Sequence, residues 1–546
     1  MGKFDSFRTY IVLTVVVGVA GLLAWRLFVL SYVRHTLYAS TAQSQSENIA
    51  NLLIRGNIYI QDPKAVDTAL GNLYLVATNK KFPAAYVVPN NVVDKEQAAD
   101  KLNAILGSDN EKIKSTLEMN SSAARAVAKK ITGEQAEAIV QLGIRGVFIQ
   151  HEMGRSYPAG PLAATTLGFL GFNEEGRRTG QYGIEAYFDE ELSGKRPADV
   201  VLTFDRNIQL FVETELDAIL KKWNATAGTV IVQDPKTGKI LAMADRPAFD
   251  PNSYSTAATE SFLNRSVQET FEPGSSFKPL TMAAGIDLGK ITPSSTYTDP
   301  GVIEIAGRQI RNFDGQSHGT VSMTTVLEKS LNTGAAWVQE RIGQSDFRDY
   351  VINFGFGQQT AIDLPGEVNG NVANLYSGRQ INFVTASFGQ GIAVTPLQLI
   401  NAYSAIANGG RLMKPYVVDH VAFEGGEIKK TEPEVASIPI SEKTAQTVRS
   451  MLVNVVDRGF DKARIPGYDI AGKTGTAQIP SKEGGYEEDV FIHDFVGFAP
   501  ASDPKFTILI KMDRPKGITF AADSLSPTFK NIAQYLINYY NIPPTR

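Results

Sequence analysis

Two β-rich hairpins lie far apart in the C-terminal part of the chain, and this separation constrains the fold strongly. The first joins 229–233 to 239–244 through Asp-Pro-Lys-Thr-Gly, and the second joins 494–499 to 506–512 through a turn with Ser-Asp-Pro. Helical segments fill the sequence between them. The clearest, 396–407, has a threonine before it, a proline at its first position and two glycines after it. Strands at both ends with helices between them predict one antiparallel sheet covered by helices.

Length and composition set the number of domains and exclude several functions. The 546 residues exceed the size of one ordinary domain, so two or three domains are expected. With 53 basic and 57 acidic residues the net charge is -4, which leaves no basic excess for binding nucleic acid. The chain has no cysteine, and no two of its five histidines have the spacing of metal ligands. Disulfides, thiol catalysis, a metal and a cofactor are therefore not expected.

An apolar run near the N-terminus predicts a membrane anchor. Residues 10–33 are almost entirely apolar and are long enough to cross a hydrocarbon layer of about 30 Å. Arg26 interrupts the run near one end, from which its side chain can reach the lipid headgroups. Lys3 and Arg8 precede the run, which favours a short cytoplasmic tail, 1–9. The expected protein crosses the cytoplasmic membrane once, with most of its residues outside the cytoplasm.

A cleaved signal peptide and a buried core helix are the alternatives to this anchor. Ser40-Thr41-Ala42 would be the cleavage site of a signal peptide, but Arg34 and His35 separate that site from the apolar run. The anchor is therefore favoured over the signal peptide.

The rest of the chain divides into two parts near residue 200. Residues 34–200 mix amphipathic helical stretches, short strands and turns, and no reactive set of residues stands out in them. An amphipathic helix at 205–223 opens the second domain, 201–546. The sequence predicts an α/β protein of the α+β type, in which a non-catalytic pedestal precedes the larger domain.

One serine and one lysine near the start of a helical run have the spacing of a nucleophile and its base. Ser275 and Lys278 lie one helical turn apart, so their side chains share one face. A proline and a glycine form the preceding turn, which places the Ser275 hydroxyl at the positive end of the helix dipole. The spacing alone is weak evidence for a catalytic pair, because Ser502 and Lys505 have the same spacing across a surface turn.

Two more short patterns follow in order along the chain. Ser330 and Asn332 flank a leucine in a turn between two helical segments. Lys473 begins a Lys-Thr-Gly-Thr sequence within a predicted strand, 470–479. Each pattern also occurs elsewhere, in unrelated contexts, at Ser46, Ser108 and Lys236.

These three patterns, in this order, resemble the active-site motifs of the penicillin-binding protein and serine β-lactamase superfamily. The resemblance covers most of 155–541, where further segments are similar to class B penicillin-binding proteins. These segments are Arg155-Ser156-Tyr157-Pro158, Glu272-Pro273-Gly274, Phe354-Gly355-Phe356-Gly357, Gly389-Gln390-Gly391 and Thr395-Pro396-Leu397-Gln398. The sequence Arg-Gly-Asn-Ile at 55–58 resembles the start of the family's non-catalytic, dimerisation-type module, although the Asp-Arg-Asn-Gly that usually accompanies it is missing.

The resemblance implies catalysis through a serine acyl-enzyme. Ser275 would attack the carbonyl group of a D-Ala-D-Ala terminus, and Lys278 would take the serine proton. A lysine can accept a proton only when its pKa is lowered, and burial beside a second cation, Lys473, would lower it. Ser330 would relay the proton to the leaving D-Ala amine.

The resemblance also implies how the substrate is held. Asn332 would hydrogen-bond the peptide backbone of the substrate. Thr474 and Thr476 face the same way on a strand, so their hydroxyl groups would hold the terminal carboxylate, and Gly475 would allow close approach. The backbone N–H groups of Ser275 and Thr476 would form an oxyanion hole, worth roughly 3–4 kcal/mol per donor.

The implied function is peptidoglycan D,D-transpeptidation, in which stem peptides are cross-linked during cell-wall synthesis and β-lactams bind covalently. The segments 271–274 and 389–391 weakly favour the septal, division-type branch of the class B penicillin-binding proteins. A D,D-carboxypeptidase or β-lactamase-type hydrolase would share the motifs, and a β-lactam-sensing membrane protein is a third alternative. The anchor and the large pedestal favour the transpeptidase, and the short tail, 1–9, disfavours the sensor.

The same resemblance implies the partners. They are peptidoglycan stem peptides, β-lactams, the cytoplasmic membrane, a separate glycosyltransferase and other wall-synthesis or division proteins. The glycosyltransferase is expected to be separate because residues 34–200 are too short for one and lack its acidic motifs.

Overall fold

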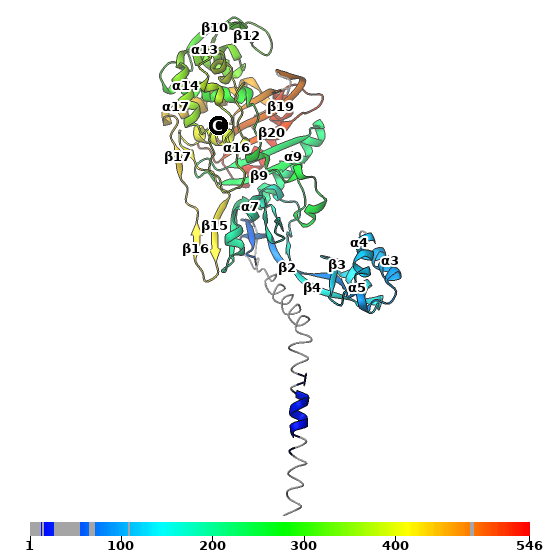
Figure 1. Cartoon of the computed structure of the whole chain (residues 1–546). Coiled ribbons are helices and arrows are strands. Elements are labelled where there is room, and N and C mark those ends of the chain that lie inside the picture. Colours follow the sequence, from blue (N-terminus) through cyan, green and yellow to red (C-terminus); the bar gives the residue numbers. More distant parts are fainter. Residues whose placement is uncertain are drawn as a thin grey trace, which may run out of the picture. The chain divides into compact units, whose positions relative to one another are not determined.

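The computed structural model describes residues 13, 16–23, 25–26, 55–64, 71–107, 110–480 and 485–546 (Figure 1). The predicted tail, 1–9, and much of the predicted membrane span, 10–33, lie outside these residues. Within the part of the chain that is described, no helix is both long enough and apolar enough to cross a membrane.

The chain forms two compact units. Among the described residues, one unit contains 79–107 and 110–154, and the other contains 55–64, 71–78, 155–480 and 485–546. Residues 155–200, which the sequence groups with the pedestal, therefore make their contacts within the larger unit.

A five-stranded antiparallel sheet forms the centre of the larger unit. Its strands are ordered β18, β19, β20, β8, β9. Their bounds are Ala471–Pro480 (β18), Tyr486–Ala499 (β19), Phe506–Asp513 (β20), Ala227–Gln233 (β8) and Ile240–Arg246 (β9). Both predicted hairpins are present, and β20 pairs with β8 to join them. The prediction of one antiparallel sheet is therefore confirmed.

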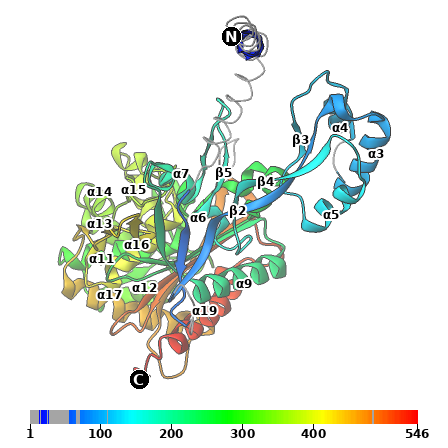
Figure 2. The ribbon, with the colours of Figure 1, turned by 90° about the horizontal axis from the view of Figure 1, so that it is seen from below.

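Two long helices, α9 (Arg206–Trp223) and α19 (Ser526–Tyr539), cover one face of this sheet. They lie side by side in Figure 2 and contact each other. Asp205 caps α9, because its carboxylate accepts hydrogen bonds from two N–H groups of the first turn. Phe211 and Tyr535 stack between the helices with their ring centroids 4.0 Å apart.

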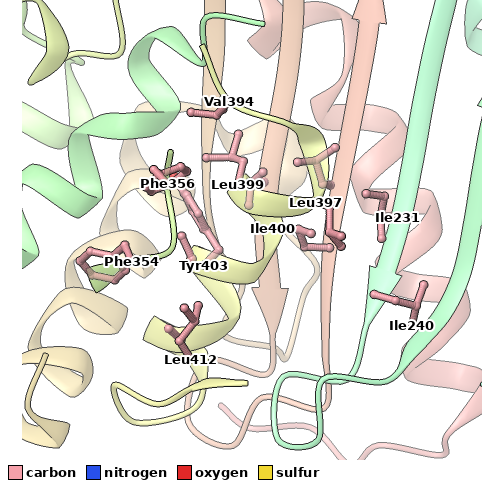
Figure 3. Close-up of a cluster of buried hydrophobic side chains, with 14 of the residues drawn as sticks. Ile231, Ile240, Phe354, Phe356, Val394, Leu397, Leu399, Ile400, Tyr403 and Leu412 are labelled. Carbon is pink, nitrogen blue, oxygen red and sulfur yellow. The ribbon is translucent and has the colours of Figure 1, made fainter. Parts of the chain in front are cut away.

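A buried helix, α16 (Pro396–Ala407), covers the other face, and all of its residues are buried. Thr395 begins the helix with a capping box, which satisfies the N–H groups that a buried helix start would otherwise leave unpaired. Figure 3 shows Leu397 and Ile400 of this helix pointing towards the sheet, where Ile231 belongs to the same apolar core. The predicted helix 396–407 thus has the predicted bounds.

Shorter helices complete the larger unit, and several of them carry the site described below. Their bounds are Ala164–Leu167 (α6), Gly183–Tyr187 (α7), Asp189–Ser193 (α8), Arg265–Gln268 (α10), Lys278–Asp287 (α11), Met323–Glu328 (α12), Asn332–Ile342 (α13), Gln344–Asn353 (α14), Gln380–Ala386 (α15), Glu442–Asn454 (α17) and Ala521–Ser524 (α18). Small two-stranded sheets pair Phe169–Phe172 (β5) with Arg178–Gln181 (β6), Thr296–Asp299 (β10) with Gly319–Ser322 (β13), Val302–Ile305 (β11) with Arg308–Arg311 (β12), and Leu412–Met413 (β14) with Val435–Ser437 (β17).

A second sheet in the larger unit joins strands from distant parts of the sequence. β1 (Ile58–Gln61) runs parallel to β7 (Ala198–Asp205) and antiparallel to the first residues of β2 (Leu73–Val87). β15 (Val418–Phe423) pairs with the other edge of β7, and β16 (Ile428–Lys430) pairs with β15. This sheet ties residues 55–78 to the C-terminal domain.

A buried ion network supports this junction. The Glu185 carboxylate accepts hydrogen bonds from Arg55 Nε at 2.6 Å and from Arg155 Nε at 2.7 Å. The Tyr157 hydroxyl donates to the same carboxylate at 3.1 Å, and Arg55 Nη1 also binds Asp189 at 2.7 Å. Glu185 is 0% exposed. Burial favours a raised pKa for Glu185, but attraction to Arg155 and Arg55 prevails and lowers it.

The smaller unit has a core of its own. It packs α3 (Lys95–Leu106), α4 (Asn110–Glu118) and α5 (Gly133–Gln141) with β3 (Arg125–Ala128) and residues 147–154 of β4. The full strand β4 is Val147–Ser156. Buried side chains hold these elements together: Val87, Ala99, Leu102, Ile113, Leu117, Val127 and Ile139.

Candidate active site

The predicted nucleophile lies in a tight turn before a helix. Residues Gly274–Phe277 form a 3-10 turn, and α11 begins directly after it at Lys278. The α-helix therefore begins three residues later than expected, but Ser275 and Lys278 still lie one turn apart. Ser275 is partly exposed, whereas Lys278 is 0% exposed. A substrate can therefore reach the serine, whereas the lysine is shielded from water.

A close backbone approach holds this turn in place. Gly274 N–H donates to the Gly389 carbonyl at 3.1 Å. A Cβ atom on Gly389 would lie 2.2 Å from the Gly274 carbonyl oxygen, so only glycine fits there. On the other side, the buried Tyr403 hydroxyl donates to the Ser276 carbonyl at 2.6 Å. The Gly-Gln-Gly segment at 389–391 thus supports the turn.

The Lys278 amine meets two serines. Its Nζ lies 3.0 Å from Ser275 Oγ, 3.1 Å from Ser330 Oγ and 2.5 Å from the Ser330 carbonyl oxygen. A neutral amine has two N–H groups and one lone pair, so it can donate twice to Ser330 and accept once from Ser275. Burial lowers the pKa of Lys278 well below its ordinary value, and repulsion from Lys473 lowers it further.

Ser330 lies between α12 and α13, as the sequence predicts, whereas Asn332 lies in α13 itself. Ser330 has φ of 55°, a left-handed conformation that a serine rarely adopts, and this conformation brings both its carbonyl and its hydroxyl to Lys278. Asn332 is the first residue of α13, and its Nδ2 donates to the Arg311 carbonyl at 2.8 Å. The amide is thereby oriented by the last residue of strand β12.

The Lys-Thr-Gly-Thr segment forms part of the edge strand β18, as predicted. Lys473 is 2% exposed, and burial lowers its pKa to about 8 although the Asp494 carboxylate opposes the shift. Thr474 and Thr476 alternate with Lys473 and are half-buried. Thr476 Oγ1 accepts a hydrogen bond from Ala521 N–H at 3.1 Å, so its own proton can point elsewhere.

Strand β18 packs directly against the serine turn. A Cβ atom on Gly274 would lie 3.2 Å from the Thr476 carbonyl, and one on Gly475 would lie 2.4 Å from the Pro273 carbonyl. The backbone of Thr476 therefore lies beside the turn that carries Ser275. The structure brings all three predicted motifs to one place.

The repeated patterns at Ser502 and Lys236 do not join this site, and those at Ser46 and Ser108 begin outside the described residues. Ser502 and Lys505 belong to the turn between β19 and β20, and Lys236 belongs to the turn between β8 and β9. Lys236 and Lys505 are exposed and both bind Asp503.

Comparison with known proteins identifies the family. The model of the penicillin binding protein transpeptidase domain matches residues 228–534, which is more than half of the chain. The model of the penicillin-binding protein dimerisation domain matches residues 54–214. The chain belongs to the class B penicillin-binding proteins.

This class B penicillin-binding protein has similar relatives in several bacteria. It is 33% identical to stage V sporulation protein D of Bacillus subtilis over 508 residues, which cover 86% of this chain and 77% of the relative. It is 28% identical to the probable peptidoglycan D,D-transpeptidase PenA of Neisseria meningitidis over 504 residues, which cover 86% of this chain and 84% of the relative.

Solved structures agree with this assignment. Penicillin-binding protein 3 of Mycobacterium tuberculosis in complex with aztreonam superposes with a TM-score of 0.67 at 32% identity, covering 72% of this chain and 92% of that structure. Penicillin-binding protein 2X of Streptococcus thermophilus has a TM-score of 0.72 at 23% identity, covering 89% of this chain and 79% of that structure, and shows the shared fold.

Sequence reasoning missed one charged residue of this class B penicillin-binding protein. Asp494 lies on β19 directly opposite Gly475 and is 0% exposed. The signal was present, because a carboxylate interrupts the strand sequence Phe-Ile-His-Asp-Phe-Val-Gly-Phe. The sequence alone does not show that this carboxylate lies on the Lys473 side of the sheet.

Proposed function

We propose that this protein is a peptidoglycan D,D-transpeptidase that works through an acyl-enzyme on Ser275. The observation that carries the proposal is the buried Lys278 amine, which lies 3.0 Å from the Ser275 hydroxyl and has a lowered pKa. A neutral amine at this distance is suited to take the serine proton during attack.

The reaction would proceed in two halves. Ser275 Oγ attacks the carbonyl carbon of the penultimate D-alanine while its proton moves to Lys278. The oxygen charge that forms is held by the backbone N–H groups of Ser275 and Thr476. Ser330 passes a proton to the nitrogen of the terminal D-alanine, which leaves as the free amino acid. The amine of a neighbouring stem then attacks the ester, a peptide bond forms and Ser275 regains its proton.

The remaining site residues would hold the substrate. Thr474 and Thr476 would bind its terminal carboxylate, with Gly475 allowing close approach, and Asn332 would bind its peptide backbone. The half-buried positions of the two threonines on an edge strand support this role.

The names of related proteins support the proposal. The Neisseria relative is named a probable peptidoglycan D,D-transpeptidase. The Mycobacterium structures contain aztreonam and ampicillin. We therefore expect β-lactams to acylate Ser275 of this protein.

Membrane attachment and partners are further parts of the proposal. The apolar run 10–33 would anchor the chain in the cytoplasmic membrane with the catalytic unit outside the cytoplasm. A separate glycosyltransferase would make the glycan strands, and other wall-synthesis or division proteins would act beside it. A fluorescent fusion that concentrates at the septum would support a division role, whereas a fusion spread along the lateral wall would indicate elongation.

Product analysis tests the transpeptidase. The purified protein, supplied with glycan strands that carry pentapeptide stems, is expected to release D-alanine and to form cross-linked dimers detected by mass spectrometry. The Ser275→Ala variant is expected to form neither product. Conversion of pentapeptides to tetrapeptides without dimers would identify a D,D-carboxypeptidase instead.

A further inference from the structure

A carboxylate is buried in the sheet beneath the Lys-Thr-Gly strand. Asp494 is 0% exposed and pairs with Gly475 on β18 and with Lys511 on β20. Residues directly opposite in an antiparallel sheet point to the same face, and so do residues two apart on one strand. Asp494 therefore shares a face with Lys473, Gly475 and Lys511. This face is the one covered by α16.

The Asp494 carboxylate occupies the space that a side chain at position 475 would need. A Cβ atom on Gly475 would lie 2.0 Å from Asp494 Oδ2. The nearby Ser276 hydroxyl donates to the Pro273 carbonyl at 2.7 Å. Among the residues that the structure describes, neither Asp494 oxygen makes a hydrogen bond of normal geometry, although the Ser276 hydroxyl lies close enough to lower the pKa of this carboxyl. A buried carboxylate without such bonds depends on nearby positive charge.

Two lysines face this carboxylate, but only one has acidic partners of its own. Lys511 Nζ lies 2.6 Å from Asp513 and 3.6 Å from Glu269. Lys473 Nζ donates to the Thr474 carbonyl at 3.1 Å, and no ion pair to Lys473 occurs within the described part of the chain. The charged form of Lys473 therefore depends more on Asp494 than the charged form of Lys511 does.

Two further ionisable groups, Tyr403 and Lys278, lie near Asp494 or near Lys473. Tyr403 approaches from α16, and the nearby negative charge of Asp494, together with burial, raises the pKa of this phenol. Lys278 lies on α11, where burial and then repulsion from Lys473 lower the pKa of its amine.

The proposed reaction needs an asymmetry between two buried lysines. Lys278 must be neutral to accept the serine proton, whereas Lys473 must be charged to repel a proton from Lys278. Both side chains are buried, and burial alone disfavours the charge on each. A further group must therefore stabilise the protonated form of one lysine over that of the other.

We propose that Asp494 is a positioning residue that keeps the positive charge on Lys473 and so leaves Lys278 as the neutral base. The inference rests on the proposed function of these two lysines. Attraction to Asp494 opposes the fall of the Lys473 pKa, which burial lowers to about 8. Burial raises the pKa of Asp494 itself to about 7, and the Ser276 hydroxyl, then Lys473 and Lys511, limit this rise. Acidification below this range would neutralise Asp494 and weaken its hold on Lys473.

The pH dependence of acylation tests this role. The rate constant for acylation by a fluorescent penicillin is measured from pH 5.5 to 9.5, and its alkaline limb follows loss of the Lys473 proton. Asp494→Asn removes the charge at nearly constant volume, so the Lys473 pKa falls. We expect the alkaline limb to move at least about one pH unit lower, which is a tenfold change in the protonation equilibrium.

Asp245→Asn is the matched control. Asp245 is another buried carboxylate on the same face of the sheet, but it lies on β9, at the opposite edge from β18. Its carboxylate accepts hydrogen bonds from the Thr229 and Ser266 hydroxyl groups. Its replacement should leave the alkaline limb in place. Asp494→Ser, which also removes the charge, should reproduce the shift seen with asparagine.

The outcomes separate this inference from the proposed function. A parent protein that penicillin does not acylate would contradict the function itself. A parent that is acylated, with an alkaline limb that stays in place in both Asp494 variants, would overturn only the role of Asp494. Loss of the fold in both variants, but not in Asp245→Asn, would assign Asp494 to stability and would also overturn the proposal.

Discussion

Replacing Lys278 with alanine is expected to lower the rate constant for acylation of Ser275 by about 10²- to 10⁴-fold. The amine lies 3.0 Å from the serine hydroxyl, and burial and then Lys473 lower its pKa. The lowered pKa favours the neutral amine, and the variant has no group to replace it. Stopped-flow fluorescence of the purified protein with a fluorescent penicillin measures the rate.

The chain contains its own control for this experiment. Ser502 and Lys505 have the same spacing as the catalytic pair, but Lys505 is exposed and binds Asp503. The double variant Ser502→Ala with Lys505→Ala should be acylated at the parental rate. Acylation of Lys278→Ala at that same rate would place the general base elsewhere.

Replacing Glu185 with alanine is expected to lower the free energy of unfolding of the larger unit by about 3–5 kcal/mol. Glu185 binds Arg55 at 2.6 Å and Arg155 at 2.7 Å, and both guanidinium groups are almost completely buried. The variant leaves their charges without the carboxylate that they share. Chemical denaturation followed by tryptophan fluorescence measures the loss.

An exposed glutamate nearby provides the comparison. Glu190→Ala, in the first turn of α8, should change the unfolding free energy by no more than about 0.5 kcal/mol. The pKa of Glu185 is lowered in the folded protein, so its contribution is present above its ordinary value of 4.5 and is lost as the pH falls through the folded pKa. Equal stability of the two variants would show that the ion network contributes nothing.

Local sequence signals predicted the elements that they specify directly. Thr395, Pro396 and the glycines at 409 and 410 set the bounds of α16, because caps and breakers act within one turn. The two hairpins followed from apolar strands beside turn residues. The motif residues could be found because each motif lies on an element that its local sequence predicts. These elements are a turn before a helix, a turn between two helices and a strand.

The contacts that the sequence did not reveal join distant segments. The parallel pairing of β1 with β7 and the meeting of Arg55 with Glu185 depend on how the whole unit folds. The left-handed backbone of Ser330 depends on the helices on both sides of it. Asp494 was visible only as a charge within a strand, since its relation to Lys473 depends on the pairing of β18 with β19.

Mass spectrometry of the acylated protein tests the central claim most directly. The parent protein, incubated with penicillin and digested, is expected to carry the whole mass of the drug on Ser275 and not on its buried neighbour Ser276, which binds Pro273. The Ser275→Ala variant is expected to carry no adduct. An adduct on Ser330 or on either lysine, or one that persists in Ser275→Ala, would contradict the assignment of Ser275 as the nucleophile.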